Sequence, residues 1–237
     1  MNEPNLTHTN APTPLARAAQ VATLLREALA ASPVGPVVLA VSGGKSPIPL
    51  LQHLSQQPLD WPRVTVVLVD ERCVPHAHPD SNAALVRQHL LQHAAAAATF
   101  IPPFDALPPL EPGQGFTPRQ LDELATQANQ RLSHLPPVAL AVLGMGEDGH
   151  TASLFPGAPG LEQALVSPGP MAWVTPATAP HARLTLTLPA LLAAQTRVLA
   201  IAGVTKQAVL DRAQVAPTPA LPVSLVLHGA PTAVWID

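Results

Sequence analysis

The chain has 237 residues, of which 47% are hydrophobic and only 11% charged, and its net charge is −3 at pH 7 with histidine neutral. This composition supports a sizeable hydrophobic core and argues against disorder, while so weak a charge argues against nucleic acid or a membrane surface as partner. No apolar run reaches the roughly 18 residues of a membrane-spanning helix. The one cysteine, Cys73, excludes an intramolecular disulfide and suits a reducing, cytoplasmic environment.

The first elements in chain order are a helix and a strand. Residues 1–14 are polar and Pro-rich, lack the charged and apolar regions of a signal peptide, and are expected to form a flexible segment. Apolar residues at helical spacing predict an amphipathic helix over residues 15–31. A short apolar strand over residues 37–41 comes next, and a second helix begins soon after Pro47.

The loop between that strand and the second helix has the composition of an anion-binding site. It reads Ser42, Gly43, Gly44, Lys45 and Ser46. The glycines let the backbone approach a ligand, the serines offer hydroxyl groups, and the lysine adds positive charge. Exposed N–H groups and the dipole of the following helix favour an anion such as phosphate. The glycine and lysine spacing differs from the Walker sequence, and a plain strand-to-helix turn is the alternative interpretation.

A second apolar strand, residues 64–69, ends in Asp70, Glu71 and Arg72. Charges at the carboxyl end of a parallel strand face the crevice in which ligands bind, so Asp70 and Arg72 are candidate ligand-binding residues. Arg72 can pair a phosphate or a carboxylate through its planar guanidinium group, although an Asp–Arg pair that only holds the loop is the alternative. Cys73 is a weak candidate nucleophile, because lone cysteines are usually inert.

The following loop contains His76, His78 and Asp80, a set that could suggest a metal site. All three lie in one proline-containing loop without a second ligand pair at helical spacing, so we expect no metal there. The favoured interpretation is a surface loop in which Ser81 or Asn82 caps a helix that runs towards residue 98.

The Pro-rich residues 100–118 are interpreted as a surface connection, and apolar residues from Leu121 to Leu132 mark another helix. The Pro-rich segment could be a domain boundary. We nevertheless expect residues 15–237 to form a single domain, because the polar motifs on both sides of that segment look like parts of one site.

An apolar strand over residues 138–143 leads into a polar loop over residues 144–156. The loop matches the Gly-x-Gly-x-x-Gly dinucleotide fingerprint, but Pro156 leaves little room for the long helix that this fingerprint requires. Its glycines, Gly146 included, are therefore expected to shape a tight turn.

The same loop contains the candidate general base. His150 can accept a proton from water near neutral pH, and Asp148 can orient the imidazole ring or balance its charge. For the motif on its own, the alternative is a structural histidine bonded to a loop carbonyl.

The last part of the chain is predicted to contain further strands and one helix. The strands are expected at residues 183–187, 198–201, 223–227 and 233–236, and the helix from about residue 206. Arg183 and Lys206 lie near strand ends and could supply positive charge to a phosphate, or they could be solvated surface charges. Strands that alternate with helices and are apolar on both faces predict an α/β fold with a mostly parallel sheet covered by helices.

Several of these segments together resemble the 6-phosphogluconolactonase family. They are residues 42–47, residues 70–75 with 80–82, residues 143–156, and Gly203 with Lys206, with residues 183–185 as a weaker match. The resemblance implies a Rossmann-like parallel sheet sandwiched by helices, as in glucosamine-6-phosphate deaminases. It also implies hydrolysis of 6-phospho-D-glucono-1,5-lactone to 6-phosphogluconate in the pentose phosphate pathway, without metal or cofactor, by a monomer or small homo-oligomer.

By this resemblance, His150 is the base that activates water and Asp148 supports it. The 42–46 loop, Arg183 and Lys206 hold the phosphate, while Arg72 lies near the lactone. Asp70 and Gly146 complete the substrate site. Many relatives have Ser or Thr in place of Lys45. The sequence does not identify the donors to the oxyanion, for which the N–H groups of the glycine loop and Arg72 are candidates.

Two other functions remain open at this point. A deaminase-isomerase acting on an amino-sugar phosphate would need further acid and base groups, and no carboxylate follows His150 before Glu162. A non-catalytic sugar-phosphate sensor would keep the phosphate loop but could lose His150. Retention of Asp148 and His150 argues against the sensor.

Overall fold

Ten strands and eight α-helices make up the regular structure of the described residues. The computed structural model describes residues 6–9, 13–110 and 113–236. The strands are β1 (Leu6–Thr9), β2 (Val37–Val41), β3 (Val64–Leu68), β4 (Asp70–Arg72), β5 (Thr99–Ile101), β6 (Val138–Leu143), β7 (Met171–Val174), β8 (Arg183–Leu186), β9 (Thr196–Ile201) and β10 (Thr232–Ile236). The helices are α1 (Pro14–Ala31), α2 (Ile48–Leu54), α3 (Asn82–His89), α4 (Pro118–Leu132), α5 (Leu161–Val166), α6 (Leu188–Ala193), α7 (Val204–Ala213) and α8 (Pro222–Gly229), with 3₁₀ turns at Trp61–Arg63 and His93–Ala97.

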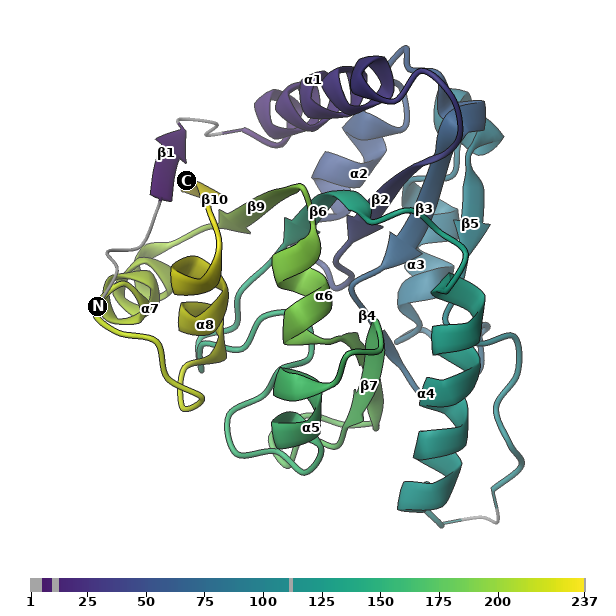
Figure 1. Cartoon of the computed structure of the whole chain (residues 1–237), viewed down its shortest axis with the longest axis vertical. Helices are drawn as coiled ribbons and strands as arrows, with labels where there is room; N and C mark the ends of the chain where they lie inside the picture. Colours follow the sequence, from purple (N-terminus) through teal and green to yellow (C-terminus); the bar gives the residue numbers. More distant parts are fainter. Residues whose placement is uncertain (1–5, 10–12, 111–112, 237) are drawn as a thin grey trace.

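Seven of the strands form one parallel sheet in the order β1-β10-β9-β6-β2-β3-β5 (Figure 1). The chain moves outward from β2 through β3 to β5, and then returns to the other side of β2 with β6, β9 and β10. The direction of winding therefore reverses between β2 and β6. In open parallel sheets, ligands bind beyond the carboxyl ends of the strands at such a point.

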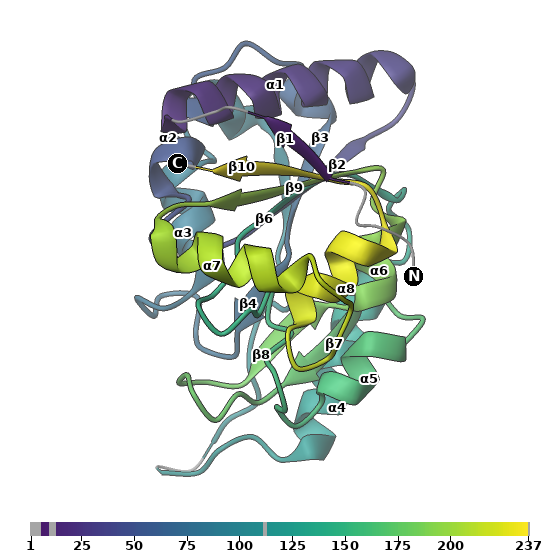
Figure 2. The same cartoon turned by 90° about the vertical axis from the view of Figure 1, so that its left-hand side faces the viewer.

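Helices cover both faces of this sheet, and the alternation of side chains along the strands explains why. In β2, Val37, Leu39 and Val41 join one buried cluster with residues of α1, α2 and α3. Val38 and Ala40 face the opposite way and join a second cluster with residues of α4 to α8. Figure 2 shows α1 above the large sheet and α7 and α8 below it. A strand with period-two geometry and two buried faces must be apolar throughout, as β2 is.

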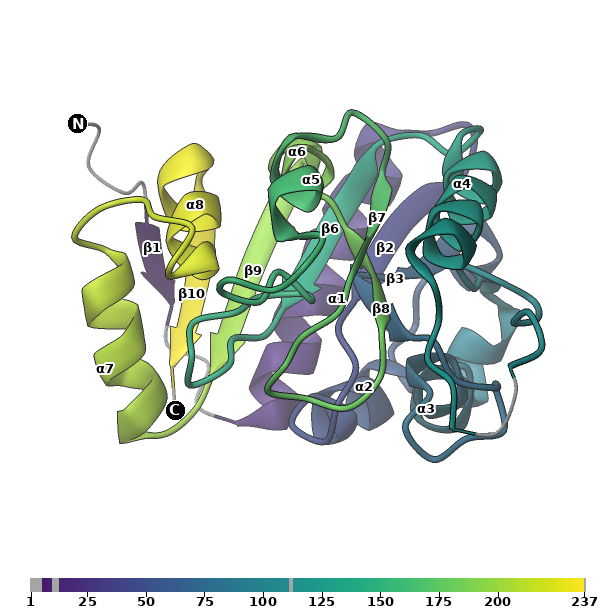
Figure 3. The same ribbon diagram turned by 90° about the horizontal axis from the view of Figure 1, so that it is seen from below.

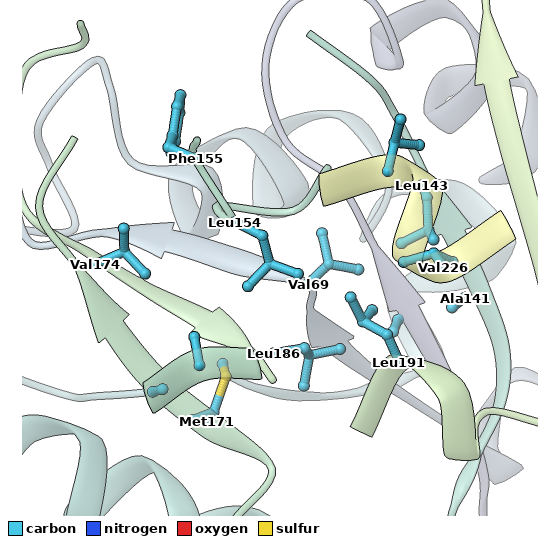
Figure 4. Packing of buried hydrophobic residues seen from close by; sticks show 14 of the residues in the cluster. Val69, Ala141, Leu143, Leu154, Phe155, Met171, Val174, Leu186, Leu191 and Val226 are labelled. Atoms are coloured by element: carbon cyan, nitrogen blue, oxygen red, sulfur yellow. The ribbon is translucent and has the colours of Figure 1, made fainter. Parts of the chain in front are cut away.

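A second, antiparallel sheet of order β4-β8-β7 lies against the large one (Figure 3). The two sheets meet at Val69, whose carbonyl accepts the N–H of Leu186 at 2.7 Å. Val69, Leu154 and Leu186 pack in the core between the sheets (Figure 4). This small sheet brings β4 and β8 to the carboxyl edge of the parallel strands.

The predicted fold class is confirmed, but two predicted elements are wrong. Residues 223–227 form part of α8 rather than a strand, and Pro222 occupies the first turn of that helix. A short apolar run fits either element, so its periodicity could not decide. The helix expected to run towards residue 98 ends at His89, and residues His93–Ala97 form a separate 3₁₀ turn that begins with a left-handed residue, His93 at φ of +49°.

Two expectations about connecting segments also change. Within residues 1–14, which we expected to be a flexible segment, Leu6–Thr9 forms strand β1 beside β10, while residues 1–5 and 10–12 lie outside the described residues. The expected surface connection at 100–118 begins with the end of β5 and buries Phe104.

In the described part of the chain, no helix combines the length and apolarity needed to cross a membrane.

Candidate active site

A pocket of about 620 Å³ lies at the carboxyl edge of the large sheet, where the loops after β2, β6 and β9 meet β4 and β8. Of the twelve residues expected at the site, eleven line this pocket: Ser42, Gly43, Gly44, Lys45, Ser46, Asp70, Arg72, Gly146, His150, Arg183 and Lys206. The twelfth, Asp148, does not line the pocket but contacts His150. The structure therefore brings together all the motifs that the sequence spreads over more than 160 residues.

Asp148 fixes the orientation of His150. Its Oδ1 lies 2.6 Å from His150 Nδ1 and also accepts the backbone N–H of His150 at 3.1 Å. A carboxylate only accepts hydrogen bonds, so the ring proton is assigned to Nδ1 and the lone pair to Nε2. Phe155 stacks against the imidazole with ring centroids 4.0 Å apart. His150 is thus held in a fixed position on the pocket wall, and in its neutral form the lone pair lies on Nε2.

Gly146 makes room for this pair. A Cβ atom at residue 146 would lie 2.3 Å from His150 Cε1 and 2.5 Å from Asp148 Oδ1. The N–H of Gly146 donates to the carbonyl of His150, and the N–H of Gly149 donates to the carbonyl of Gly146. The glycine loop is therefore closed by its own hydrogen bonds, so these two N–H groups are not available to an oxyanion.

The loop after β2 is built differently. Its N–H groups from Gly43 to Ser46 make no hydrogen bond to any residue in the described ranges. Gly44 has φ of +83°, and a left-handed residue within such a turn directs successive N–H groups into one concave, anion-binding surface. The Ser42 hydroxyl does not join them, because it donates to the carbonyl of Val142 at 3.0 Å and ties β2 to β6.

Positive charge dominates the lining of the pocket. Its five cations are Arg17, Lys45, Arg72, Arg183 and Lys206, and the one lining carboxylate is that of Asp70. Neither lysine ammonium group has a hydrogen-bond or ion-pair partner among the described residues. A low-dielectric pocket with such an excess of cations favours an anionic ligand.

Asp70 is largely occupied by the protein itself. Its Oδ2 accepts the Ser153 hydroxyl at 2.7 Å and lies 3.7 Å from Arg183 NH1. Arg183 is buried, its guanidinium carbon lies 5.6 Å from the centroid of the Phe155 ring, and burial lowers its pKa. Its Nε has no partner among the described residues. Asp70 thus orients Arg183, whose side chain lines the pocket.

Arg72 lies directly opposite Arg183 in the β4–β8 pair. Its NH1 donates to the carbonyl of Asp80 at 2.7 Å, and its Nε has no partner among the described residues. The Asp80 carboxylate in turn lies 2.9 Å from His181 Nε2, and this hydrogen bond lowers the pKa of Asp80.

His78, Asp80 and His181 lie close enough to suggest a metal site, but hydrogen bonds explain their arrangement. His78 Nδ1 accepts the N–H of Asp80 at 3.1 Å, and the Asp80 carboxylate contacts His181. The third residue of the predicted set, His76, instead contacts the carbonyl of Phe104 through Nε2.

The sequence analysis missed two polar residues of the pocket lining, Asn82 and Arg17. Asn82 Nδ2 donates to the carbonyl of Asp70 at 2.8 Å, and a Cβ on Gly43 would lie 1.9 Å from Asn82 Oδ1. Gly43 must therefore be glycine for Asn82 to pack there. Arg17 is buried on α1 and donates to the carbonyl of Ile201. The sequence signal that could have identified Arg17 was a single charge on the apolar face of a predicted helix.

Glu71 had no predicted role, yet it fixes the start of α3. Its buried carboxylate accepts the N–H groups of Asn82 and Ala83 at 2.8 and 2.7 Å and the Ser81 hydroxyl at 3.2 Å. Burial raises the pKa of Glu71, although these backbone donors oppose the shift. By holding the helix start, Glu71 also places Asn82 against the β2 loop.

Comparisons with known proteins agree with this geometry. Residues 12–235 match the family described as glucosamine-6-phosphate isomerases/6-phosphogluconolactonase. A 6-phosphogluconolactonase of Pseudomonas aeruginosa is 46% identical over 92% of this chain and 88% of its own length. One of Neisseria meningitidis is 44% identical over 82% and 81%. The crystal structure of a 6-phosphogluconolactonase from Shewanella baltica has a TM-score of 0.85 and 34% identity, and the match covers 100% of this chain and 99% of that one.

Proposed function

The chain belongs to the family of glucosamine-6-phosphate isomerases and 6-phosphogluconolactonases, and we propose that it hydrolyses 6-phospho-D-glucono-1,5-lactone to 6-phospho-D-gluconate in the oxidative branch of the pentose phosphate pathway. One observation carries the proposal. A histidine held by a carboxylate and a loop of unsatisfied N–H groups line the same cation-rich pocket. The first suits hydrolysis of an ester, and the second suits binding of a phosphate.

His150 is the general base of the proposed reaction. Its Nε2 takes a proton from water as the water oxygen attacks the lactone carbonyl. The imidazolium then gives this proton to the ring oxygen as the C–O bond of the ring breaks, which leaves the open acid and restores the base. Asp148 keeps the ring proton on Nδ1 and stabilises the imidazolium that forms. A lactone is a reactive ester, so this reaction needs no covalent intermediate, metal or cofactor.

Arg72 is the favoured donor to the developing oxyanion. The N–H groups of Gly146 and Gly149 already have partners inside the glycine loop. Arg72 lines the pocket, and its NH2 group has no hydrogen-bond partner among the described residues. A fixed cationic donor stabilises the tetrahedral intermediate more than it stabilises the lactone, because the negative charge develops in the transition state.

The phosphate binds the β2 loop, Lys206 and Arg183. The loop offers its N–H groups and the ammonium of Lys45, and Lys206 has no partner that it must give up. Arg183 and His150 contact the same Phe155 ring, at 5.6 and 4.0 Å. A six-carbon sugar phosphate can span that separation, so the phosphate can hold the ring while its lactone carbonyl meets His150.

The pocket favours a lactonase over its two rivals. Asp70 is the only carboxylate among the described lining residues, and it is engaged by Ser153 and Arg183. A deaminase-isomerase needs further free acid and base groups for ring opening. A non-catalytic sensor has no use for the Asp148–His150 pair. We expect a monomer or small homo-oligomer, and we place the enzyme in the cytoplasm.

One experiment separates these functions. The purified protein is assayed for lactone opening above the spontaneous rate, with and without a chelator, beside an assay for ammonia release from glucosamine 6-phosphate. We expect chelator-insensitive lactone hydrolysis and no ammonia. Ammonia release would favour the isomerase, and binding of the sugar phosphate without turnover would favour the sensor.

A further inference from the structure

His181 has a strained backbone beside the pocket. Its φ is +70°, a left-handed conformation that costs energy for a residue with a Cβ atom. Such a conformation persists only when the surrounding contacts hold it, and it occurs most often at functional sites. His181 does not itself line the pocket, so its contacts with neighbouring residues must explain it.

The residues on either side of His181 hold the wall of the pocket. The carbonyl of Pro180 accepts Arg183 NH2 at 3.2 Å. The carbonyl of Ala182 accepts the N–H of Cys73 at 2.8 Å, next to Arg72. The left-handed turn at His181 thus directs one carbonyl to each of the two strands that supply the pocket arginines.

The side chain of His181 makes the corresponding link to Arg72. Its Nε2 lies 2.9 Å from Asp80 Oδ2, and its ring meets that of His78 edge-on at 5.3 Å. The backbone carbonyl of Asp80 accepts Arg72 NH1 at 2.7 Å. His181 and Asp80 therefore join the loop before β8 to the loop after β4.

These links act against a repulsion. Arg72 and Arg183 are cross-strand partners in the antiparallel pair, and like charges directly opposite one another destabilise a sheet. Asp70 forms an ion pair with Arg183 but neither an ion pair nor a hydrogen bond with Arg72. Arg72 depends on the Asp80 carbonyl to hold its guanidinium group in place.

We propose that His181 and Asp80 form a clasp that positions the guanidinium groups of Arg72 and Arg183 for the anionic substrate. The proposal rests on the proposed function for the identity of that substrate. His181 is a positioning residue, because it acts through the two arginines and does not touch the pocket.

The test is a double-mutant cycle on lactone hydrolysis. His181→Gly removes the clasp and relieves the backbone strain, and we expect kcat/KM to fall about tenfold, the effect of one misplaced charged hydrogen bond. His181→Asn tolerates the left-handed backbone and keeps an N–H donor, so it should stay within about threefold of the wild type. His93→Gly changes the other left-handed histidine whose contacts lie away from the pocket, and should leave kcat/KM unchanged.

The cycle distinguishes positioning from general weakening of the fold. Adding Arg72→Ala to His181→Gly should cost much less than Arg72→Ala alone, because both changes remove the same interaction. Adding Lys206→Ala to His181→Gly should lower kcat/KM by the product of the two single losses, because these two residues act independently. Independent effects of His181→Gly and Arg72→Ala, or full activity of His181→Gly, would overturn the clasp. If His181→Gly does not fold, Asp80→Ala probes the same contact from the other side.

A failure of the clasp proposal can be distinguished from a failure of the proposed function. If the wild type does not open the lactone, the proposed function fails, and the cycle is then measured by calorimetry with inorganic phosphate. Weaker phosphate binding by His181→Gly, restored in His181→Asn, would still support the clasp. Equal binding by all three proteins would refute it.

Discussion

The loops after β6 and β2 leave neighbouring parallel strands, yet their hydrogen bonds are opposite in kind. In the β6 loop, the N–H groups of Gly146, Gly149 and His150 all have partners inside the loop. In the β2 loop, the N–H groups from Gly43 to Ser46 have none among the described residues. The protein itself therefore holds the N–H groups around His150, whereas those of the β2 loop are left for a ligand.

The difference follows from what each loop has to do. A general base must be held in one position before the substrate arrives, because misplacement slows the chemical step. An anion site must keep its donors free, and this costs little where water can reach them, as it can at the exposed Lys45 and Ser46. The β6 loop should therefore control turnover, and the β2 loop should control substrate affinity.

The largest expected effect tests the β6 loop. His150→Ala removes the proposed base, and we expect kcat to fall by about 10²- to 10⁴-fold, the usual contribution of general base catalysis. The measurement is the rate of lactone opening above the spontaneous rate. His134→Ala, at an exposed histidine outside the pocket, is the control and should behave as the wild type. Unchanged turnover in His150→Ala would disprove the assignment.

The same substitution in both loops gives the sharpest comparison. Gly146→Ala places a Cβ 2.3 Å from the His150 ring, so kcat should fall about 100-fold through displacement of the base. Gly44→Ala meets nothing within 4 Å but strains a residue at φ of +83° by about 1–2 kcal/mol. It should raise KM several-fold and lower the melting temperature. If both variants changed kcat alone, the division of roles would be wrong.

A smaller effect is expected for Lys206, which lines the same pocket as the β2 loop. Lys206→Ala should raise KM about tenfold with little change in kcat, because it removes one charged contact to the phosphate. The KM of the wild type should also rise with ionic strength more than that of the variant. Arg119→Ala, on an exposed face of α4, is the matched loss of positive charge outside the pocket. An unchanged KM in Lys206→Ala would remove this residue from the phosphate site.

Much of the fold could be predicted because local patterns dominate it. The apolar strands β2, β3 and β6 and the amphipathic helices α1 and α4 follow directly from periodicity. Residues 223–227 could not be assigned, because five consecutive residues without alternation satisfy both a buried strand and a buried helix. Only the packing of Val223, Val226 and Leu227 in the core decides for the helix.

The candidate site could be predicted where the residues that interact are also close in the sequence. Asp148 and His150 are two residues apart, so their contact could be anticipated. The link of Asp80 to His181 could not, because these residues are 101 positions apart and meet only through the β4–β8 pairing. The role of Ser153, which binds Asp70 83 positions away, was hidden for the same reason.

The smallest expected effect concerns the reactivity of Cys73. It tests whether the protein's own contacts keep the part of the site around the β6 loop closed to reagents. Cys73 packs in the same buried cluster as Leu154 and Phe155, and burial raises its pKa to about 12. The native thiol should therefore resist a disulfide reagent at pH 8 and react at once after denaturation. Above pH 9 the unfolded chain loses the thiol proton and the folded chain does not, so stability should fall steadily as the pH rises towards 12. Rapid labelling of the native protein would mean that this part of the site opens in solution, and that only bound substrate, rather than the protein's own contacts, fixes His150 for the reaction.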